Sequence, residues 1–458
     1  GQPGATDLRS WTSLKATVGS ATFIGIGDLG VAVNSLSVEI NQGGGTLNGV
    51  VNTTVADFSR SALRVTTGPG TFLDLDFNGT YGSLLRAAGA LTLIIGDFRV
   101  SGGFGIEKTE ATRQSGTKTI KTSKLLIGAA GIDLFLGAGG PPYDNEDTGV
   151  LVEDMQFGLV MFKELDVTNP ASPLPADPAS PGAKMALVAS GGARLLGIDG
   201  LELSGTLELR KNNTGYTQDL GGGYVLNETL NVPDPDNPET MIPVEIKFKE
   251  NIDLGLSGTV ILKIVDTATG DEFVSLKGGF AFSKTETVAA GVTTTKIKVG
   301  AAGVETFLGV GPARIADEST ADPDDTKINP DAMGVLIENV EVGLVLIKKS
   351  GGSVPAASTY AIDASGAASL LGIDGLSLSG SLGVRINKTG AAVDEHITVP
   401  LPGGGTKDVH IQFSSPTSAL SVAGTVDLDI AGIVTLRGGF AFTKQTISAT
   451  SSKILVGA

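Results

Sequence analysis

The stretch LLGIDGLELSGTLEL at Leu195–Leu209 organises the rest of the chain, because it returns almost unchanged at Leu370–Val384 as LLGIDGLSLSGSLGV. A weaker copy, IGIGDLGVAVNSLSVEI, lies at Ile24–Ile40. Each copy leads into an asparagine; the three are Asn41, Asn212 and Asn387. Self-similarity at a period of roughly 160–175 residues indicates an array of repeated structural units.

Other landmarks recur in the same order. The string GGF-x-x-x-K occurs at Gly102–Lys108, Gly278–Lys284 and Gly438–Lys444. A short L-S-G-T-V-like strand is expected at Leu256–Val260 and Val422–Val426, with FNGTY at Phe77–Tyr81 as its first copy. Glycines such as Gly258 and Gly424 recur in mid-strand, which predicts bulges or the close approach of another backbone.

The shared order of landmarks predicts the domain boundaries. Residues 1–127 hold the back part of one repeat, 128–299 form a complete repeat, and 300–456 form another. Residues 457–458 begin a further copy. We therefore expect the chain to be a segment of a longer array of repeats.

Alternation of apolar and polar residues predicts strands almost throughout. Leu201, Leu203 and Leu207 share one face of a strand, as a half-buried strand requires. We expect Leu203 to point inward, so that Leu203→Ala costs about 2–5 kcal/mol. Val150–Phe162 is apolar on both faces and predicts a central strand covered on both sides.

No segment has the period of a helix. Ala361–Leu371 is the nearest candidate, and Gly366 argues against it. The predicted fold class is all-β, with tandem β-rich repeats that are β-sandwich or β-solenoid-like and form an elongated array.

Composition excludes several classes of function. The formal net charge is −16, which disfavours nucleic acid as a partner, since nucleic-acid binding depends on Lys and Arg. The chain has no Cys, which excludes disulfides, thiol catalysis and zinc–thiolate sites. The sequence contains no apolar run long enough for a transmembrane helix.

Acidic loops are the candidate metal sites. Carboxylates cluster in three loops, and Ca²⁺ prefers such oxygen ligands. The candidate ligands are Asp144, Glu146, Asp147, Asp234, Asp236, Asp322, Asp324 and Asp325. The positions do not recur between copies, so solvated turns are the alternative interpretation. Ca²⁺ is the one cofactor that the sequence suggests.

No catalytic motif is present, and we predict that the chain is not an enzyme. His396 and His410 are the two histidines of the chain, and the repeat at 128–299 has none, so we interpret them as surface residues. Asp199 and Asp374 recur before a glycine, as turn-forming residues do. The Gly-rich strings lack the spacing of phosphate-binding loops.

The cysteine-free, acidic, Gly- and Thr-rich tandem pattern resembles the repeat regions of giant bacterial surface proteins, such as adhesins and extracellular matrix proteins. The resemblance implies a structural stalk or filament, extracellular or on the cell surface, with adhesive capacity. Its partners would be neighbouring repeats, identical chains, and surface polysaccharide or matrix.

Three alternatives to a stalk or filament remain open. A lipid-conducting β groove would show strands with one continuous apolar face. An outer-membrane β-barrel would need more than the five Tyr and one Trp of this chain. A polysaccharide-acting enzyme would need a site in the loops of one module.

Overall fold

The computed structural model is all-β, as predicted. It describes residues 6–23, 29–95, 98–139, 144, 146–178, 182, 184–237, 240–265, 272–317, 319, 326–351, 357–415, 419–448 and 451–458. Among them, 18 strands belong to one antiparallel sheet, and the other strands form two-stranded ladders. The helical content of these residues is one short 3₁₀ turn, η1 (Gly79–Tyr81), and they include no helix with the length and apolarity to cross a membrane.

Contacts divide the chain into two compact units. The first contains residues 1–138, 151–191 and 210–251, and the second contains 139–150, 192–209 and 252–458. Each unit is described by itself below.

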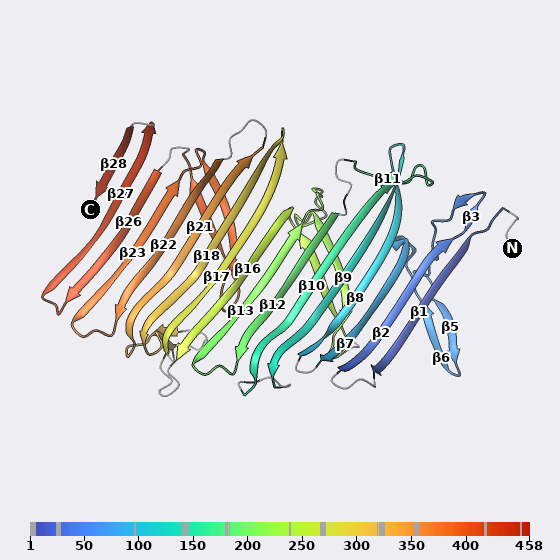
Figure 1. Ribbon diagram of the computed structural model, residues 1–458, viewed down its shortest axis with the longest axis horizontal. Helices are drawn as coiled ribbons and strands as arrows, with labels where there is room; N and C mark the ends of the chain where they lie inside the picture. Colours follow the sequence, from blue (N-terminus) through green and yellow to red (C-terminus); the bar gives the residue numbers. More distant parts are fainter. Residues whose placement is uncertain are drawn as a thin grey trace. The chain divides into compact units, whose positions relative to one another are not determined.

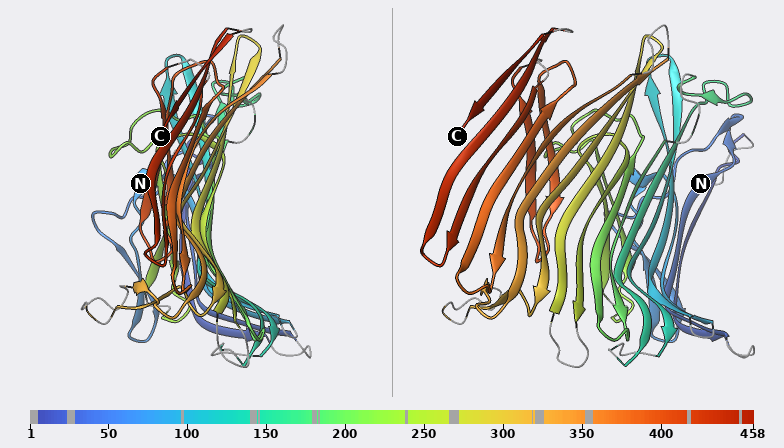
Figure 2. Two further views of the ribbon diagram at one scale, coloured as in Figure 1. Left: turned by 90° about the vertical axis from the view of Figure 1, so that its left-hand side faces the viewer. Right: turned by 60° about the vertical axis from the view of Figure 1, so that its left-hand side comes forward.

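In the first unit, strands that follow one another in sequence pair with one another, as Figure 1 shows in blue to teal. The sheet strands are β1 (Ser10–Phe23), β2 (Leu29–Gly44), β7 (Ser83–Ile95), β8 (Phe98–Ser115), β9 (Lys118–Ala138), β10 (Thr148–Asp166) and β12 (Lys184–Leu196), with the short β11 (Leu174–Pro175) beside β10. Small ladders join β3 (Thr46–Leu47) to β4 (Val50–Val51) and β5 (Leu63–Gly68) to β6 (Thr71–Leu75). Figure 2 shows the long strands of this unit bending towards one end.

The second unit is also built from long antiparallel strands, drawn in yellow to red in Figure 1. Its long strands are β16 (Ile252–Val265), β17 (Glu272–Ala289), β18 (Val292–Val310), β21 (Met333–Ser350), β22 (Ala357–Leu371), β23 (Leu376–Asn387), β26 (Ala419–Ile430), β27 (Val434–Ser448) and β28 (Ser451–Gly457). These pair antiparallel in that order. Most of β13 (Leu201–Asn212) also belongs here, as does the ladder of β19 (Arg314–Ala316) and β20 (Thr326–Ile328).

A β-hairpin packs on one face of the sheet in each unit; we call this face the hairpin face and the opposite one the open face. In the first unit, β14 (Leu226–Pro233) and β15 (Met241–Phe248) pack on β7, β8 and β9. In the second, β24 (Val393–Pro400) and β25 (Thr406–Phe413) pack on β16, β17, β18, β21 and β22. The buried core lies under these hairpins, which bury Val232 and Ile246 in one unit and Val399 and Ile411 in the other.

The repeated GGF string explains how closely each hairpin packs. A Cβ built at Gly103 of β8 would lie 1.8 Å from the carbonyl oxygen of Pro233, at the end of β14. A Cβ at Gly279 of β17 would lie 1.6 Å from the carbonyl oxygen of Pro400, at the end of β24. Only glycine permits such an approach of two backbones.

Ion pairs and buried asparagines fix each hairpin further. Lys124 of β9 lies 2.9 Å from Glu228, and Lys296 of β18 lies 2.5 Å from Glu395. The recurring asparagines are buried and join the residues before and after the hairpin. Asn212 donates to the carbonyl of Glu250 and accepts from Thr214, while Asn387 donates to the carbonyl of Ser415 and accepts from Thr389.

Several local predictions are corrected or confirmed. Phe77–Tyr81 is not a strand, because Gly79–Tyr81 forms η1; Gly89 of β7 instead pairs with Phe104 as Gly258 of β16 pairs with Phe280. Mid-strand Gly258 does meet another backbone, since its Cβ would lie 2.1 Å from the carbonyl oxygen of Thr206.

Two predictions about burial are wrong. Leu203 does not point inward: 41% of its surface is exposed, because it lies on the open face of β13. Within the part of the chain that the structure describes, Val150–Phe162 is covered on one side only. Gly158 of β10 lies under Ile246 of the hairpin, whereas Phe157 lines a groove on the open face.

Candidate functional site

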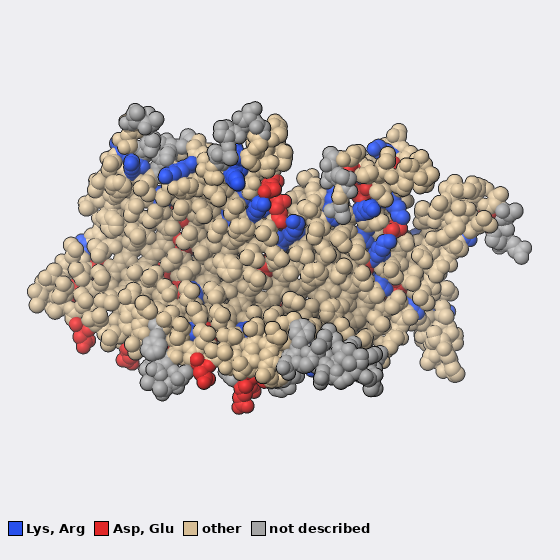
Figure 3. All heavy atoms as spheres, in the orientation of Figure 1, with Lys and Arg blue, Asp and Glu red and all other residues tan. Residues whose placement is uncertain are grey.

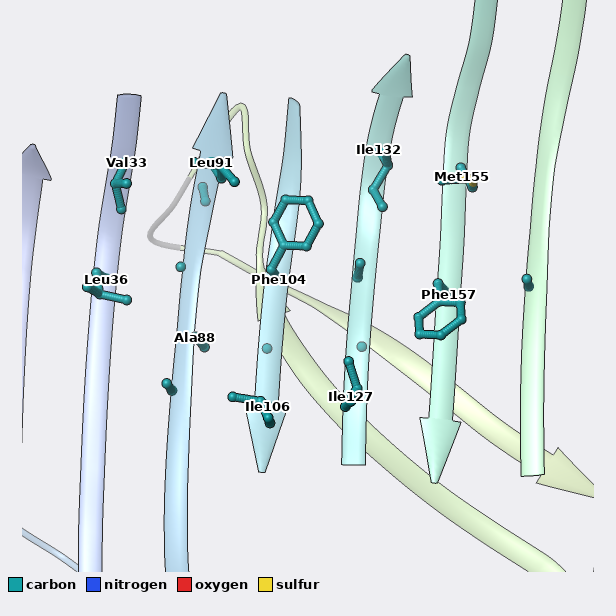
Figure 4. Close-up of a pocket in the computed structure, with 17 residues that line it drawn as sticks. Val33, Leu36, Ala88, Leu91, Phe104, Ile106, Ile127, Ile132, Met155 and Phe157 are labelled. Atoms are coloured by element: carbon teal, nitrogen blue, oxygen red, sulfur yellow. The ribbon is translucent and has the colours of Figure 1, made fainter. Parts of the chain in front are cut away.

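The open face of the first unit contains an apolar groove of about 690 Å³ that crosses β2, β7, β8, β9, β10 and β12. All of its lining residues are apolar or glycine. The larger side chains among them are Val33, Leu36, Leu91, Phe104, Ile106, Ile127, Ile132, Met155 and Phe157. Figure 4 shows these side chains arrayed along neighbouring strands, with the hairpin of β14 and β15 on the far side.

Bulges in the strands shape the groove. Ser35, Gly131 and Asp154 have positive φ, of 59°, 58° and 51°. The first two lie at irregularities in the pairing of β2 with β7 and of β8 with β9. The bulky residue after each positive-φ position then covers a glycine on the neighbouring strand. The contacts are Leu36 over Gly89, Ile132 over Gly102 and Met155 over Gly191. The bulges bend the strands and place large apolar side chains on the open face.

None of the described residues that line the groove is charged, although charged groups lie close to it. Asp133, directly after Ile132, accepts a hydrogen bond from the backbone N–H of Asp154 at 3.2 Å. Burial raises the pKa of Asp133. Arg86 pairs with Glu39 and Glu107, but on the hairpin face. Figure 3 shows a broad area of uncharged side chains, with charged ones gathered mainly along its upper and lower edges and in the right-hand part of the view.

The second unit carries a related hollow on its open face. It has a volume of about 570 Å³ and crosses β21, β22, β23, β26 and β27. Val340, Leu378, Leu382 and Phe440 line it, together with hydroxyl side chains. Leu382 and Phe440 are 49% and 42% exposed. Contiguous exposed apolar surface of this kind marks interaction or ligand-binding sites.

Three of the predicted metal ligands accept backbone hydrogen bonds within their own turns. Asp144 accepts from the backbone N–H of Glu146 at 2.8 Å, and Asp147 accepts from that of Asp144 at 2.8 Å. Asp234 accepts from the backbone N–H of Asp236 at 2.9 Å. These carboxylates therefore already stabilise their own turns, as the alternative interpretation states.

The remaining predicted ligands either are exposed or lie outside the residues that the structure describes. Glu146 and Asp236 are exposed. Asp322, Asp324 and Asp325 lie outside the described residues. Asp199 and Asp374 lie in turns between strands, as expected. The Ca²⁺ prediction stays a prediction.

One cluster was missed by sequence reasoning. His396 of β24 and His410 of β25 are directly opposite in the pairing of the two strands, on the face of the hairpin that points away from the sheet. Their rings stack at 4.1 Å between centroids. Asp394 and Asp408 each lie 2.6 Å from a ring nitrogen. The signal was available, because the two histidines lie equally far before and after Gly403 in the turn.

Comparison with known proteins adds no relative to this picture. No protein-family model matches the chain, and no curated protein matches its sequence.

Proposed function

We propose that the open face binds the acyl chains of lipids, and that the chain is a lipid-binding β groove. The observation that carries this proposal is the groove of the first unit, in which apolar side chains and glycines from six strands line about 690 Å³. Ligand pockets of proteins are typically about 300–1,000 Å³ and mostly apolar. A hydrocarbon chain is the ligand class that needs no polar partner.

The energetics favour loose, exchangeable binding. Each buried methylene contributes about 0.8 kcal/mol, so covering about ten methylenes contributes roughly 8 kcal/mol. Immobilising the ligand costs at least about 4 kcal/mol. The net affinity suits a surface along which lipids move better than a site that retains one molecule.

We further infer that the chain is a tandem array of roughly 160–175 residues per repeat. The sequences and contacts of the two hairpins support this. The hairpin strands LNETLNVP (Leu226–Pro233) and VDEHITVP (Val393–Pro400) both contain Glu at the third position and Pro at the last. In each unit the Glu pairs with a lysine of the sheet, and the carbonyl oxygen of the Pro lies against a glycine of the sheet. The boundaries 1–127, 128–299, 300–456 and 457–458 follow from this array as predictions. Stacked repeats would extend the open face beyond one groove.

The test of lipid binding is a titration with a fluorescent fatty acid. The variant Phe157→Glu places a carboxylate in the groove, and we expect binding at least about tenfold weaker, since a buried charge without a partner is costly. The matched control is Val50→Glu, which adds the same charge at a residue that is 70% exposed and outside the groove. Equal binding by both variants, or no binding by the parent protein, would refute the proposal.

A structural stalk or filament at the cell surface is the second candidate. The observation that favours it is that each hairpin packs on strands that precede it in the chain, which ties successive sections together. Such neighbour interfaces stabilise repeat arrays without any ligand. An extracellular protein that carries no lipid after purification from its source, and forms filaments, would favour this candidate over the groove.

A further inference from the structure

We propose that Asp394, His396 and His410 bind a divalent transition-metal ion on the outer face of the hairpin of β24 and β25. The chain contains two histidines, and both lie here. The pairing of β24 with β25 sets them directly opposite each other. Their rings are nearly parallel, with an interplanar angle of 11°.

The possible donor atoms of the three residues lie close together. The Nε2 of His410 lies 2.6 Å from Oδ1 of Asp394, and the Nε2 of His396 lies 3.9 Å from the same oxygen. One donor atom from each of the three residues lies within 4.8 Å of the other two. Two imidazole nitrogens and a carboxylate oxygen form a donor set that suits Zn²⁺, Cu²⁺ or Ni²⁺.

Asp408 supplies the outer support that metal-binding histidines usually have. Its Oδ2 lies 2.6 Å from Nδ1 of His396. A carboxylate that accepts a hydrogen bond from Nδ1–H keeps the proton on Nδ1, which leaves the lone pair of Nε2 for the metal. Asp408 therefore acts as a positioning residue. The site is exposed to solvent, so water or a partner group can complete the coordination.

The hairpin holds these residues in a fixed geometry. The opposite face of the same strands buries Ile397, Val409 and Ile411 against the sheet. Nearby cations are already engaged: Lys298 donates to the backbone carbonyl of His396, and Lys407 pairs with Glu341 at 2.8 Å. Coordination would join β24 to β25 across the hairpin.

The other hairpin provides an internal comparison. It carries Thr229 opposite Glu245, on the strands that correspond to β24 and β25. Its pairing and packing are similar, but it lacks imidazoles. The metal site is thus a property of one hairpin and is independent of the lipid-binding proposal.

The experiment is a calorimetric titration of the chelator-treated protein with Zn²⁺ at neutral pH. We expect one site per chain. The variants His396→Gln and His410→Gln should each weaken binding more than about tenfold, and Asp408→Asn should weaken it by about 10–100-fold without removing a ligand. The control Glu245→Gln, on the other hairpin, should leave the affinity unchanged.

A folding check keeps the result interpretable. Hydrogen exchange of the β24 and β25 amides in each metal-free variant should match that of the parent protein, and Zn²⁺ should slow this exchange only where His396 and His410 are both present. Zn²⁺ binding that survives both substitutions would assign the metal to other acidic groups and overturn the site. Absence of binding by the parent protein would also overturn it.

Discussion

Substituting Gly279 of β17 tests how the hairpins are held. A Cβ at this position would lie 1.6 Å from the carbonyl oxygen of Pro400 and 3.1 Å from Cγ1 of Val399. Gly279→Ala therefore forces the end of β24 away from the sheet. A gap of 0.5–1 Å already forfeits about a quarter to a half of the dispersion energy between packed atoms.

The magnitude follows from the side chains that the gap would loosen. Ile397, Val399 and Val409 of the hairpin are buried against the sheet, and full burial of each stabilises the fold by about 1.5–3 kcal/mol. Losing about half of this gives a destabilisation of roughly 2–5 kcal/mol. Since 1.4 kcal/mol is a factor of ten, hydrogen exchange of the β24 and β25 amides should accelerate by at least about 30-fold.

Gly439 of β27 is the matched control. It occupies the same place in the GGF string, but the nearest atom to its Cβ would be the carbonyl oxygen of Gly424, at 3.7 Å. Gly439→Ala should change stability by no more than about 1 kcal/mol, and in the stabilising direction, because alanine suits a strand better than glycine. Equal effects of the two substitutions on exchange in β24 and β25 would refute the close-packing argument.

Two further predictions concern stability. Ile411→Ala, at a residue with 0% exposure, should lower the free energy of unfolding by about 2–5 kcal/mol, whereas Leu203→Ala on the open face should cost less than about 1 kcal/mol; urea titration compares them. Burial alone would raise the pKa of Glu110, but hydrogen bonds from Lys121 and Lys108 outweigh it and lower the pKa to about 2. Glu110 therefore stabilises the fold above its ordinary pKa of 4.5, and this contribution should fade as the pH falls from there towards 2. Urea midpoints measured across that range should fall less in Glu110→Gln than in the parent protein, and equal slopes would contradict the assignment.

The strands could be predicted because alternation of apolar residues follows directly from backbone geometry. The close approach of another backbone at the mid-strand glycine Gly258 was also predicted correctly. Alternation divides a strand into two faces without saying which one is covered. Leu203 was assigned to the core for this reason, although the covered face of the sheet is the one under the hairpins.

The candidate site depends on contacts between residues that lie far apart in the sequence, and these contacts cannot be read from the sequence. The groove gathers Leu36, Phe104 and Phe157 from strands far apart in the chain, and only the meander brings them together. The glycine at Gly103 indicates that another part of the backbone comes close. The sequence does not show that this part is Pro233, because Pro233 lies in a hairpin far along the chain. The histidine pair could have been found, because equal distances from the turn predict a cross-strand pair.

The most direct test of the central claim is to purify the protein from cells, extract it with organic solvent and identify bound lipid by mass spectrometry, alongside Phe157→Glu and Val50→Glu. The open-face account predicts acyl lipids with the parent protein and with Val50→Glu, and strongly reduced amounts with Phe157→Glu. Lipid-free parent protein that also fails to take up fatty acid in solution, or equal lipid in all three proteins, would contradict it.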